Sequence, residues 1–212
     1  MGISERKQRE KEDLKKQILE AAKTLFVEKG FESTSMRNIA ELLEFSPTRL
    51  YIYYKDKNAI IYELHKEGFK LLSAQFQQLP QQDQPFERLK AIGHIYLQFA
   101  QNHPDFYEVM FVMKGPIVHI KQYSQHENWA EGTKVYETLL NTVTKCQEQG
   151  YFPGKEAHQI SLLIWSTLHG ISMLNLHQHL SCIDDGYQLA DTTKNNAMEI
   201  FETFIKFIER TT

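Results

Sequence analysis

Two short helical segments, separated by a few residues within 34–57, constrain the fold of this chain more than any other feature. Ser46 is placed to cap the second segment, and Pro47 follows at a first helical position, where its missing N–H has no consequence. The first segment has one apolar face at helical spacing, made by Met36, Ile39, Ala40 and Leu43. With an amphipathic helix over 14–29 that ends at Gly30, these segments predict a three-helix head.

The rest of the chain also follows helical periodicity, and no alternating stretch of useful length interrupts it. We therefore predict an all-α fold of about nine helices. Six predicted helices follow the head, over residues 57–79, 86–102, 104–113, 118–149, 155–180 and 188–210. Asp56 is placed to cap the first of these, and Ser181 to Gly186 is predicted to be a loop between the last two.

The segment 46–54 has a packing side and a free side. Leu50 and Tyr54 lie on the same side of the segment and can pack onto the preceding helices. The outward positions are Pro47, Thr48, Arg49, Ile52 and Tyr53. A major groove admits one α-helix, and an arginine suits a guanine or a phosphate, so this pattern predicts a helix-turn-helix that reads DNA. Patterning alone leaves an alternative, in which the tyrosines are packing residues and the basic groups a solvated face.

Charge supports contact with DNA at one end of the chain. Lys55 and Lys57 lie near a predicted helix N-terminus, where amides and ammonium groups can hold phosphate. Arg37, on the first short helix, is expected to face the same surface. Residues 1–57 contain 12 Lys and Arg against 10 Asp and Glu, whereas residues 58–212 contain 12 against 17.

The composition excludes several classes of protein. The net charge of −3 argues against a chain coated in nucleic acid. The apolar runs are far shorter than the ~20 residues needed to cross a bilayer, and the charged N-terminus does not resemble a signal peptide, so we expect a cytoplasmic protein with no membrane partner. Cys146 and Cys182 make no disulfide framework and are expected to be small apolar side chains; a bond between them stays an open alternative.

The N-terminal part resembles the tetracycline-repressor (TetR) family of bacterial one-component regulators. The matching runs are ILEAA at 18–22, LFVEKGF at 25–31, TSMRNIA at 34–40 and SPTRLYIYYKDK at 46–57. The resemblance implies that the groove-facing positions are Pro47, Thr48, Arg49, Tyr51 and Ile52, and that Arg37 can read a guanine. It implies phosphate contacts at Thr34, Ser35, Tyr53 and Lys57. The charged arm with Arg6, Lys7, Arg9 and Lys11 would add phosphate or minor-groove contacts, or else be a disordered tail.

One position departs from the family pattern. The turn between the two short helices usually holds glycine, and here it holds Glu44. A residue with a side chain must either adopt a left-handed backbone, at a penalty of about 1–2 kcal/mol, or change the turn. The C-terminal part, through residues 96–111, Trp165 and His169-Gly170, resembles the family's C-terminal domain type named for its Trp, His and Gly.

The resemblance implies a helical body over 58–212, after a DNA-binding domain over 1–57, with the helix at 57–79 linking the two. Such a body encloses an effector site and forms a homodimer through its last two helices. A small hydrophobic or aromatic effector would be lined by Phe99, His103, Phe106, Tyr107, Met110, Trp129, Tyr136, Trp165, His169 and Met173. The alternative is that these aromatic residues fill the core. The dimer interface is predicted at Leu162, Ile164, Leu168, Ile171, Ile200, Phe204 and Ile208.

The predicted function is a TetR-family regulator, a repressor that binds a palindromic DNA operator as a dimer. A metal-responsive regulator is one rival, because His169, His177, His179 and Cys182 lie near one another in sequence. Their spacing is not that of a zinc site, so no metal and no cofactor is expected. A helical scaffold or ligand-binding protein that no longer reads DNA is another rival. An enzyme is not expected, because the chain lacks a nucleophile elbow, a phosphate loop and an HExxH motif.

Overall fold

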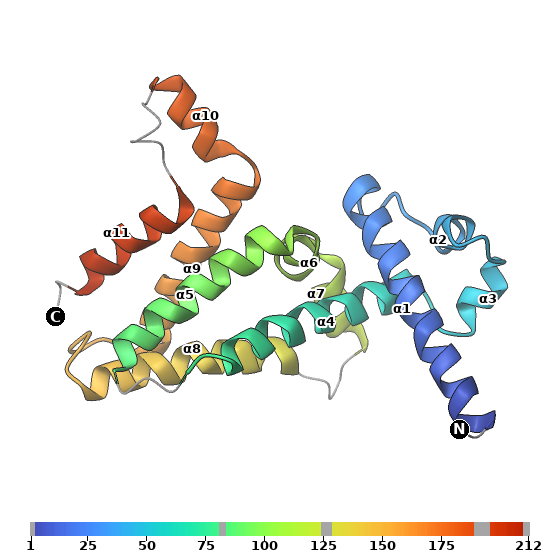
Figure 1. The fold of residues 1–212 in the computed structure, drawn as a ribbon, viewed down its shortest axis with the longest axis horizontal. Coiled ribbons are helices and arrows are strands. Elements are labelled where there is room, and N and C mark those ends of the chain that lie inside the picture. The colour runs from blue at the N-terminus through green and yellow to red at the C-terminus, as the bar shows by residue number, and fades with distance from the viewer. Residues whose placement is uncertain (1–2, 81–83, 124–128, 189–195, 210–212) are drawn as a thin grey trace. The chain divides into compact units, whose positions relative to one another are not determined.

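The computed structural model describes residues 3–80, 84–123, 129–188 and 196–209, and all regular structure within them is helical. Eleven α-helices and one π-helical turn make up the described part (Figure 1). The first half contains α1 (Ile3–Lys29), α2 (Met36–Leu42), α3 (Pro47–Tyr51), α4 (Lys57–Gln77), α5 (Pro85–Asn102), α6 (Pro104–Tyr107) and the π-helical turn Glu108–Val112. The second half contains α7 (Gly115–Tyr123), α8 (Ala130–Glu148), α9 (Ala157–Leu176), α10 (His179–Gly186) and α11 (Ala197–Glu209). The all-α prediction is confirmed, with more helices than the nine expected.

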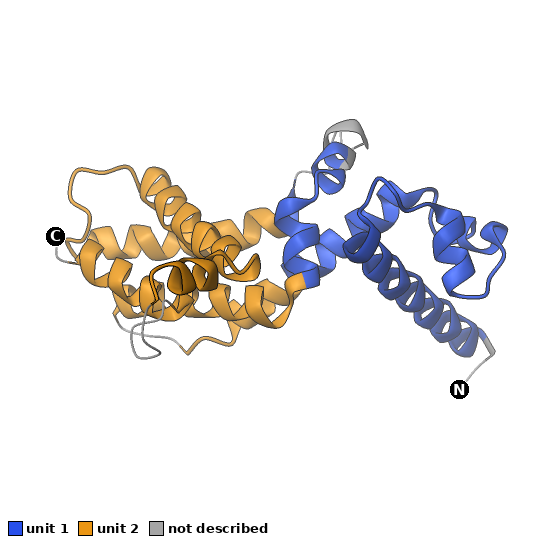
Figure 2. Cartoon of the chain, turned by 90° about the horizontal axis from the view of Figure 1, so that it is seen from above, with its two compact units in different colours: residues 1–70, 105–130 blue, residues 71–104, 131–212 orange. Residues whose placement is uncertain are grey.

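The chain divides by its contacts into two compact units, each discontinuous in sequence (Figure 2). Unit 1 consists of residues 1–70 and 105–130, and unit 2 of residues 71–104 and 131–212. The sequence predicted a DNA-binding domain over 1–57 and a body over 58–212, and that division stays a prediction. The segment 105–130 therefore packs with the head although it lies far from it in sequence, and α4 runs from one unit into the other.

Unit 1 is built on the three-helix head that the sequence predicted. Figure 1 shows α2 and α3 beside each other next to α1. Gly30 ends α1 in a left-handed conformation with φ of 81°, as its position predicted. Ser35 caps α2: its hydroxyl accepts the N–H of Asn38, and the Asn38 side chain accepts the Ser35 N–H. The buried core of this head includes Ile18, Phe26, Ile39, Leu50 and Ile60, with Val109 from the later segment.

Three predictions about helix boundaries were wrong. The helix predicted over 14–29 begins earlier, because α1 is helical from Ile3, so the charged arm is part of this helix and not a disordered tail. The predicted helix 118–149 is interrupted, since Trp129 is not helical and α8 begins at Ala130. The predicted loop after Ser181 is the helix α10, which follows Gln178, a residue in the left-handed conformation. No helix among the described residues is long and apolar enough to span a membrane.

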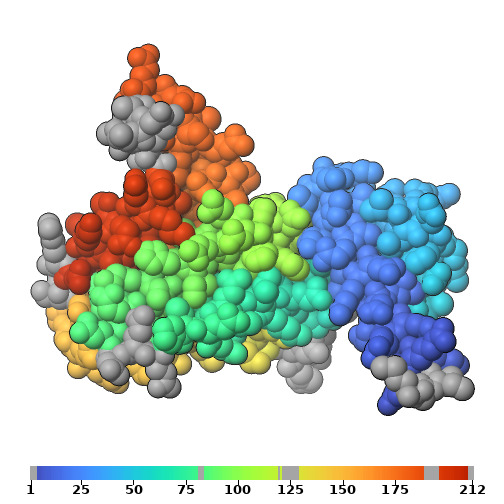
Figure 3. All heavy atoms as spheres, in the orientation of Figure 1, coloured from blue at the N-terminus to red at the C-terminus, as the bar shows by residue number. Residues whose placement is uncertain are grey.

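Unit 2 is organised around α5, α9 and α11, which contact one another pairwise. Figure 3 shows the atoms of α11 lying directly against those of α5. At Gly93 of α5 there is no room for a side chain, because an added Cβ atom would overlap the ring of Phe201 from α11. Phe201 is fully buried, so its ring cannot move aside into solvent. Gly93 therefore permits the crossing of α5 and α11.

Candidate nucleic-acid interface

The turn between α2 and α3 keeps a left-handed backbone without glycine. Glu44 has φ of 55°, so of the two alternatives for this position the chain adopts the strained backbone and not a changed turn. The N–H of the next residue, Phe45, donates to the carbonyl of Ala40 at 2.9 Å, which is the 6→1 bond that ends a helix after a left-handed residue. Ser46 then begins α3 with Pro47 in its first turn, although the Ser46 hydroxyl makes no capping bond. The turn thus closes the two helices onto each other.

The helix α3 is held by one buried side chain and exposes the others. Leu50 is fully buried in the head core, and Tyr54 is buried just beyond the helix. Ile52 is 72% exposed, and its neighbour Tyr51 is exposed as well. The exposed residues are those predicted to face the groove: Pro47, Thr48, Arg49, Tyr51 and Ile52. Their contact with bases stays a prediction.

The two arginines predicted to read bases have different surroundings. The Nε atom of Arg37 lies 3.2 Å from a carboxylate oxygen of Glu41, one turn along α2. The guanidinium carbon of Arg49 lies 4.0 Å from the centroid of the Phe45 ring. Arg37 is therefore paired with an anion, whereas Arg49 is stacked on an aromatic face, which leaves its N–H edges available.

Two of the four predicted phosphate contacts are engaged inside unit 1. Thr34 is only 2% exposed, and its hydroxyl donates to the carbonyls of Leu25 and Gly30. The ammonium of Lys57 donates to the carbonyls of Phe31 at 2.8 Å, Thr34 at 3.1 Å and Glu32 at 3.2 Å. Both side chains therefore fix the loop between α1 and α2, a role that the sequence did not indicate.

The other predicted phosphate contacts lie nearer the surface. Ser35 is exposed at the start of α2, and Tyr53 is half-buried after α3. The four basic residues predicted for the arm are exposed along the first turns of α1: Arg6, Lys7, Arg9 and Lys11. Among them, Arg6 pairs with Glu10 at 2.8 Å. All of these contacts with DNA remain predictions.

Four residues of the predicted effector lining lie in unit 1: Phe106, Tyr107, Met110 and Trp129. Trp129 contacts Phe69 edge-on, with ring centroids 5.3 Å apart, and its indole N–H donates to Nε2 of His65 at 3.3 Å. His65 is a polar residue that the sequence reasoning missed, since a lone histidine within a helix carries no motif. Burial lowers the pKa of His65 to about 4, so the ring is neutral near pH 7. Because Nε2 accepts, the ring proton is on Nδ1, which has no hydrogen-bond partner among the described residues.

The other six residues of the predicted lining lie in unit 2: Phe99, His103, Tyr136, Trp165, His169 and Met173. The indole N–H of Trp165 donates to the Tyr96 hydroxyl at 3.1 Å. Burial lowers the pKa of His169 from its ordinary value, which favours its neutral form. The ten predicted residues are thus divided between the units, and their common role in binding an effector is not established by either unit alone.

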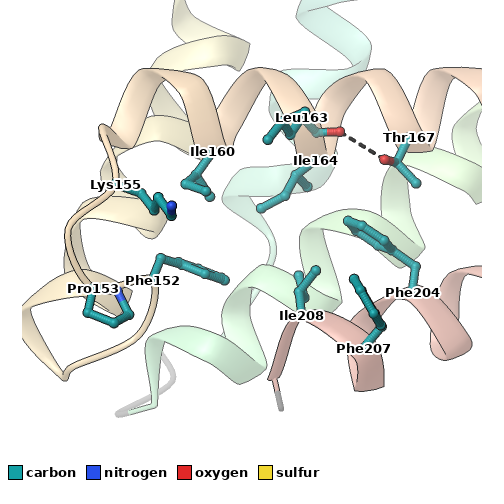
Figure 4. Close-up of a pocket in the computed structure, with 10 residues that line it drawn as sticks. All are labelled: Phe152, Pro153, Lys155, Ile160, Leu163, Ile164, Thr167, Phe204, Phe207 and Ile208. Carbon is teal, nitrogen blue, oxygen red and sulfur yellow. Dashed lines mark hydrogen bonds between the residues drawn. The ribbon is translucent and has the colours of Figure 1, made fainter. Parts of the chain in front are cut away.

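A groove between α9 and α11 in unit 2 has a volume of about 310 Å³ (Figure 4). Its lining is almost entirely apolar and consists of Phe152, Pro153, Lys155, Ile160, Leu163, Ile164, Thr167, Phe204, Phe207 and Ile208. The Thr167 hydroxyl does not add polarity, because it donates to the carbonyl of Leu163 at 2.9 Å. The groove is therefore an open apolar surface of the described chain.

The predicted dimer residues lie differently around this groove. Ile164, Leu168 and Ile171 are buried within the protomer, so they stabilise its own core. Leu162 is exposed, and the three half-buried residues are Ile200, Phe204 and Ile208. The sequence reasoning missed Leu163 and Phe207, which are 62% and 68% exposed. The positions of these two residues along their helices alone did not distinguish the face that packs against α5 from the face that stays exposed.

Two family models match this chain. The model described as "Bacterial regulatory proteins, tetR family" matches residues 18–64, and the model described as "Tetracyclin repressor-like, C-terminal domain" matches residues 89–194. The second match spans half of the chain. The chain belongs to the TetR family. It is a DNA-binding transcriptional regulator, and TetR-family regulators are transcription factors without enzymatic activity. The Trp-His-Gly subtype of the C-terminal domain stays a prediction.

Solved structures share this TetR fold across most of their length. A TetR-family transcriptional regulator, PfmR from Thermus thermophilus, is 23% identical with a TM-score of 0.67, over 91% of this chain and 97% of that one. A protein of unknown function from Rhodococcus sp. RHA1 is 19% identical with a TM-score of 0.69, over 93% and 94%. The ketosteroid transcriptional regulator KstR2 of Mycobacterium tuberculosis is 17% identical with a TM-score of 0.65, over 92% of each. Among curated proteins, no sequence matches this chain.

Metal control of this TetR-family regulator gains no support from the described residues. They contain no group of three His, Cys, Asp or Glu side chains arranged to hold a metal ion. The rings of His177 and His179 have centroids 6.3 Å apart and are inclined to each other. Cys182 is exposed and Cys146 is buried, both as free thiols. Burial raises the pKa of the Cys146 thiol to about 12, so it stays protonated and a poor metal ligand.

Proposed function

We propose that this TetR-family regulator is a repressor that binds a palindromic operator as a homodimer and is released by a small hydrophobic or aromatic effector. The single observation that carries the proposal is the exposed face at α3. Arg49 and Ile52 are exposed there, whereas Leu50 is buried and holds the helix in the head. An arginine can read guanine, and an isoleucine can contact a thymine methyl group.

The homodimer is supported by the open apolar surface on α9 and α11. Leu163 and Phe207 are large, exposed and next to the apolar groove between these helices. A twofold interface would bury this surface on both protomers at once. The dimer would present two copies of α3 to half-sites roughly 34 Å apart, one turn of the duplex.

The effector class is supported by the aromatic residues of each unit and by the neutral His65. An apolar site with a few polar groups suits an apolar ligand that carries one polar group. The likeness to KstR2, a ketosteroid regulator, and to a fatty acid degradation regulator, FadR from Bacillus halodurans, agrees with an apolar effector. The effector would act by its differential affinity for two states of the protein, with α4 as the link because it runs from unit 1 into unit 2.

A selection of bound genomic DNA tests the operator. Purified protein is mixed with fragmented DNA of its source organism at near-physiological salt, and the bound fragments are sequenced. We expect a recurring palindrome near a few promoters. The variant with both Arg37→Ala and Arg49→Ala should lose about 10- to 100-fold in affinity for that palindrome and keep its weak binding to unrelated DNA. Capture without a common sequence by the unaltered protein would instead indicate a helical protein that has lost operator recognition.

The dimer has its own test in charged substitutions at the apolar face. Leu163→Glu and Phe207→Glu each place a carboxylate on the surface that a partner would cover, so we expect monomers at micromolar concentration. Val27→Glu is the control, because it makes a similar change at an exposed apolar residue of α1. Sedimentation velocity measures the result. A stable dimer in both α9 and α11 variants would rule out this face as the interface.

A further inference from the structure

We propose that Phe45 is a positioning residue that holds the Arg49 guanidinium ready to read a guanine, an inference that rests on the proposed operator binding. The contact that suggests it is the stacking of Arg49 on the Phe45 ring, at 4.0 Å. Arg49 alone would touch the base. Phe45 would act through Arg49, by fixing where its planar group lies before DNA arrives.

Phe45 is itself fixed by the turn in which it lies. Its N–H donates to the carbonyl of Ala40, directly after the left-handed Glu44. Its side chain is half-buried and packs against the core of the head. One part of the ring therefore rests on the protein interior while a face is available to the arginine. A ring held in this way keeps a fixed position against which the Arg49 guanidinium can lie.

Arg49 is fixed at its backbone and free at its N–H edges. The backbone N–H of Arg49 donates to the carbonyl of Ser46 at 3.0 Å in the first turn of α3. The side chain is exposed, and within the described part of the chain it forms no ion pair, in contrast to Arg37. Stacking occupies the face of the guanidinium and leaves its fork of N–H donors pointing along the plane. Such a fork matches the O6 and N7 acceptors of guanine.

The composition of α3 makes Arg49 the group that would discriminate between bases. The helix spans Pro47–Tyr51, and Arg49 is its single charged residue. An unrestrained arginine must lose side-chain freedom when it binds, whereas one already stacked loses less. The phenylalanine would therefore increase both the affinity for the operator and the preference for guanine at one base pair.

The test compares substitutions of Phe45, alone and in an Arg49→Ala background, on the operator that the unaltered protein selects. Phe45→Leu keeps an apolar side chain in the turn and removes the aromatic face, whereas Phe45→Tyr keeps the face. We expect Phe45→Leu to weaken operator binding by about 2- to 5-fold for each half-site and to reduce discrimination at one G·C pair. Phe45→Tyr should behave as the unaltered protein does. In an Arg49→Ala background, Phe45→Leu should have no further effect.

Several results would overturn this inference. Unchanged binding and discrimination in Phe45→Leu would do so, and so would an equal loss in the Arg49→Ala background, which would indicate a purely structural role. If the Arg49→Ala variant binds with a weaker salt dependence but still discriminates between base pairs, Arg49 contacts phosphate instead of a base. If the unaltered protein selects no operator, the proposed function fails first, and this inference fails with it.

A second measurement on the free protein keeps the stacking testable if Phe45→Leu does not fold. Nuclear magnetic resonance relaxation of the Arg49 side-chain Nε–H group reports its order without DNA. We expect this order to be high in the unaltered protein and in Phe45→Tyr. A mobile Arg49 side chain in both would overturn the inference.

Discussion

The substitution Gly93→Val is expected to lower the free energy of unfolding of unit 2 by about 3 kcal/mol. A Cβ atom at Gly93 would lie 2.0 Å from Cζ of Phe201, and the Phe201 ring is fully buried between α5 and α11. The added side chain must therefore displace a helix or a well-packed ring. Denaturant unfolding measures the effect, followed by the fluorescence of Trp165 in a Trp129→Phe background, since the chain has two tryptophans.

The matched control is Gly186→Val, at the end of α10, where a Cβ atom would meet nothing within 4 Å. We expect this control to change the free energy by less than about 0.5 kcal/mol. The double variant Gly93→Val with Phe201→Ala should lose less stability than the sum of the two single losses, because the smaller residue makes room for the valine. Equal stability of Gly93→Val and the control would contradict the close crossing of α5 and α11.

The substitution Lys57→Met is expected to lower the free energy of unfolding of unit 1 by about 2 kcal/mol. The ammonium of Lys57 donates to three carbonyls between α1 and α2, and its nitrogen lies 4.4 Å from the Phe31 ring centroid. Methionine keeps most of the side-chain volume and removes the charge and all three bonds. Unfolding is followed by the fluorescence of Trp129 in a Trp165→Phe background.

Lys16→Met is the control, because Lys16 is an exposed lysine of α1 in the same unit and carries the same charge. We expect it to leave the stability of unit 1 almost unchanged. The resemblance to other TetR-family regulators gave Lys57 a phosphate contact instead. In that case Lys57→Met would keep the stability and reduce the slope of log affinity against log salt by about one. The two measurements therefore separate an internal role from an external one.

The head could be predicted from the sequence because short-range chemistry fixes it. Gly30 ends α1, and Asp56 caps α4 by accepting the N–H of Ala59 at 2.8 Å. The exposed face of α3 followed from the positions of Leu50 and Tyr54 alone. Each of these features depends on residues within a few positions of one another.

The rest depended on contacts between distant residues or on backbone conformations that the residue types do not favour. The helix α10 was missed because it follows Gln178, which adopts a left-handed conformation that its residue type rarely takes. The hydrogen bond between Trp129 and His65 joins residues 64 positions apart, so no local sequence pattern predicts it. The stacking of Arg49 on Phe45 follows a left-handed turn at Glu44, a backbone that this residue type rarely adopts.

Left-handed turns without glycine have a consequence for how this regulator can evolve. Glu44, Gln178 and Gln188 all have positive φ values, and a glycine at each position would relieve a strain of about 1 kcal/mol. Such single-step gains can offset changes elsewhere that are useful but destabilising. Glycine substitutions in these turns would therefore offset destabilising substitutions in α3. The operator preference could then change while the protein stays folded.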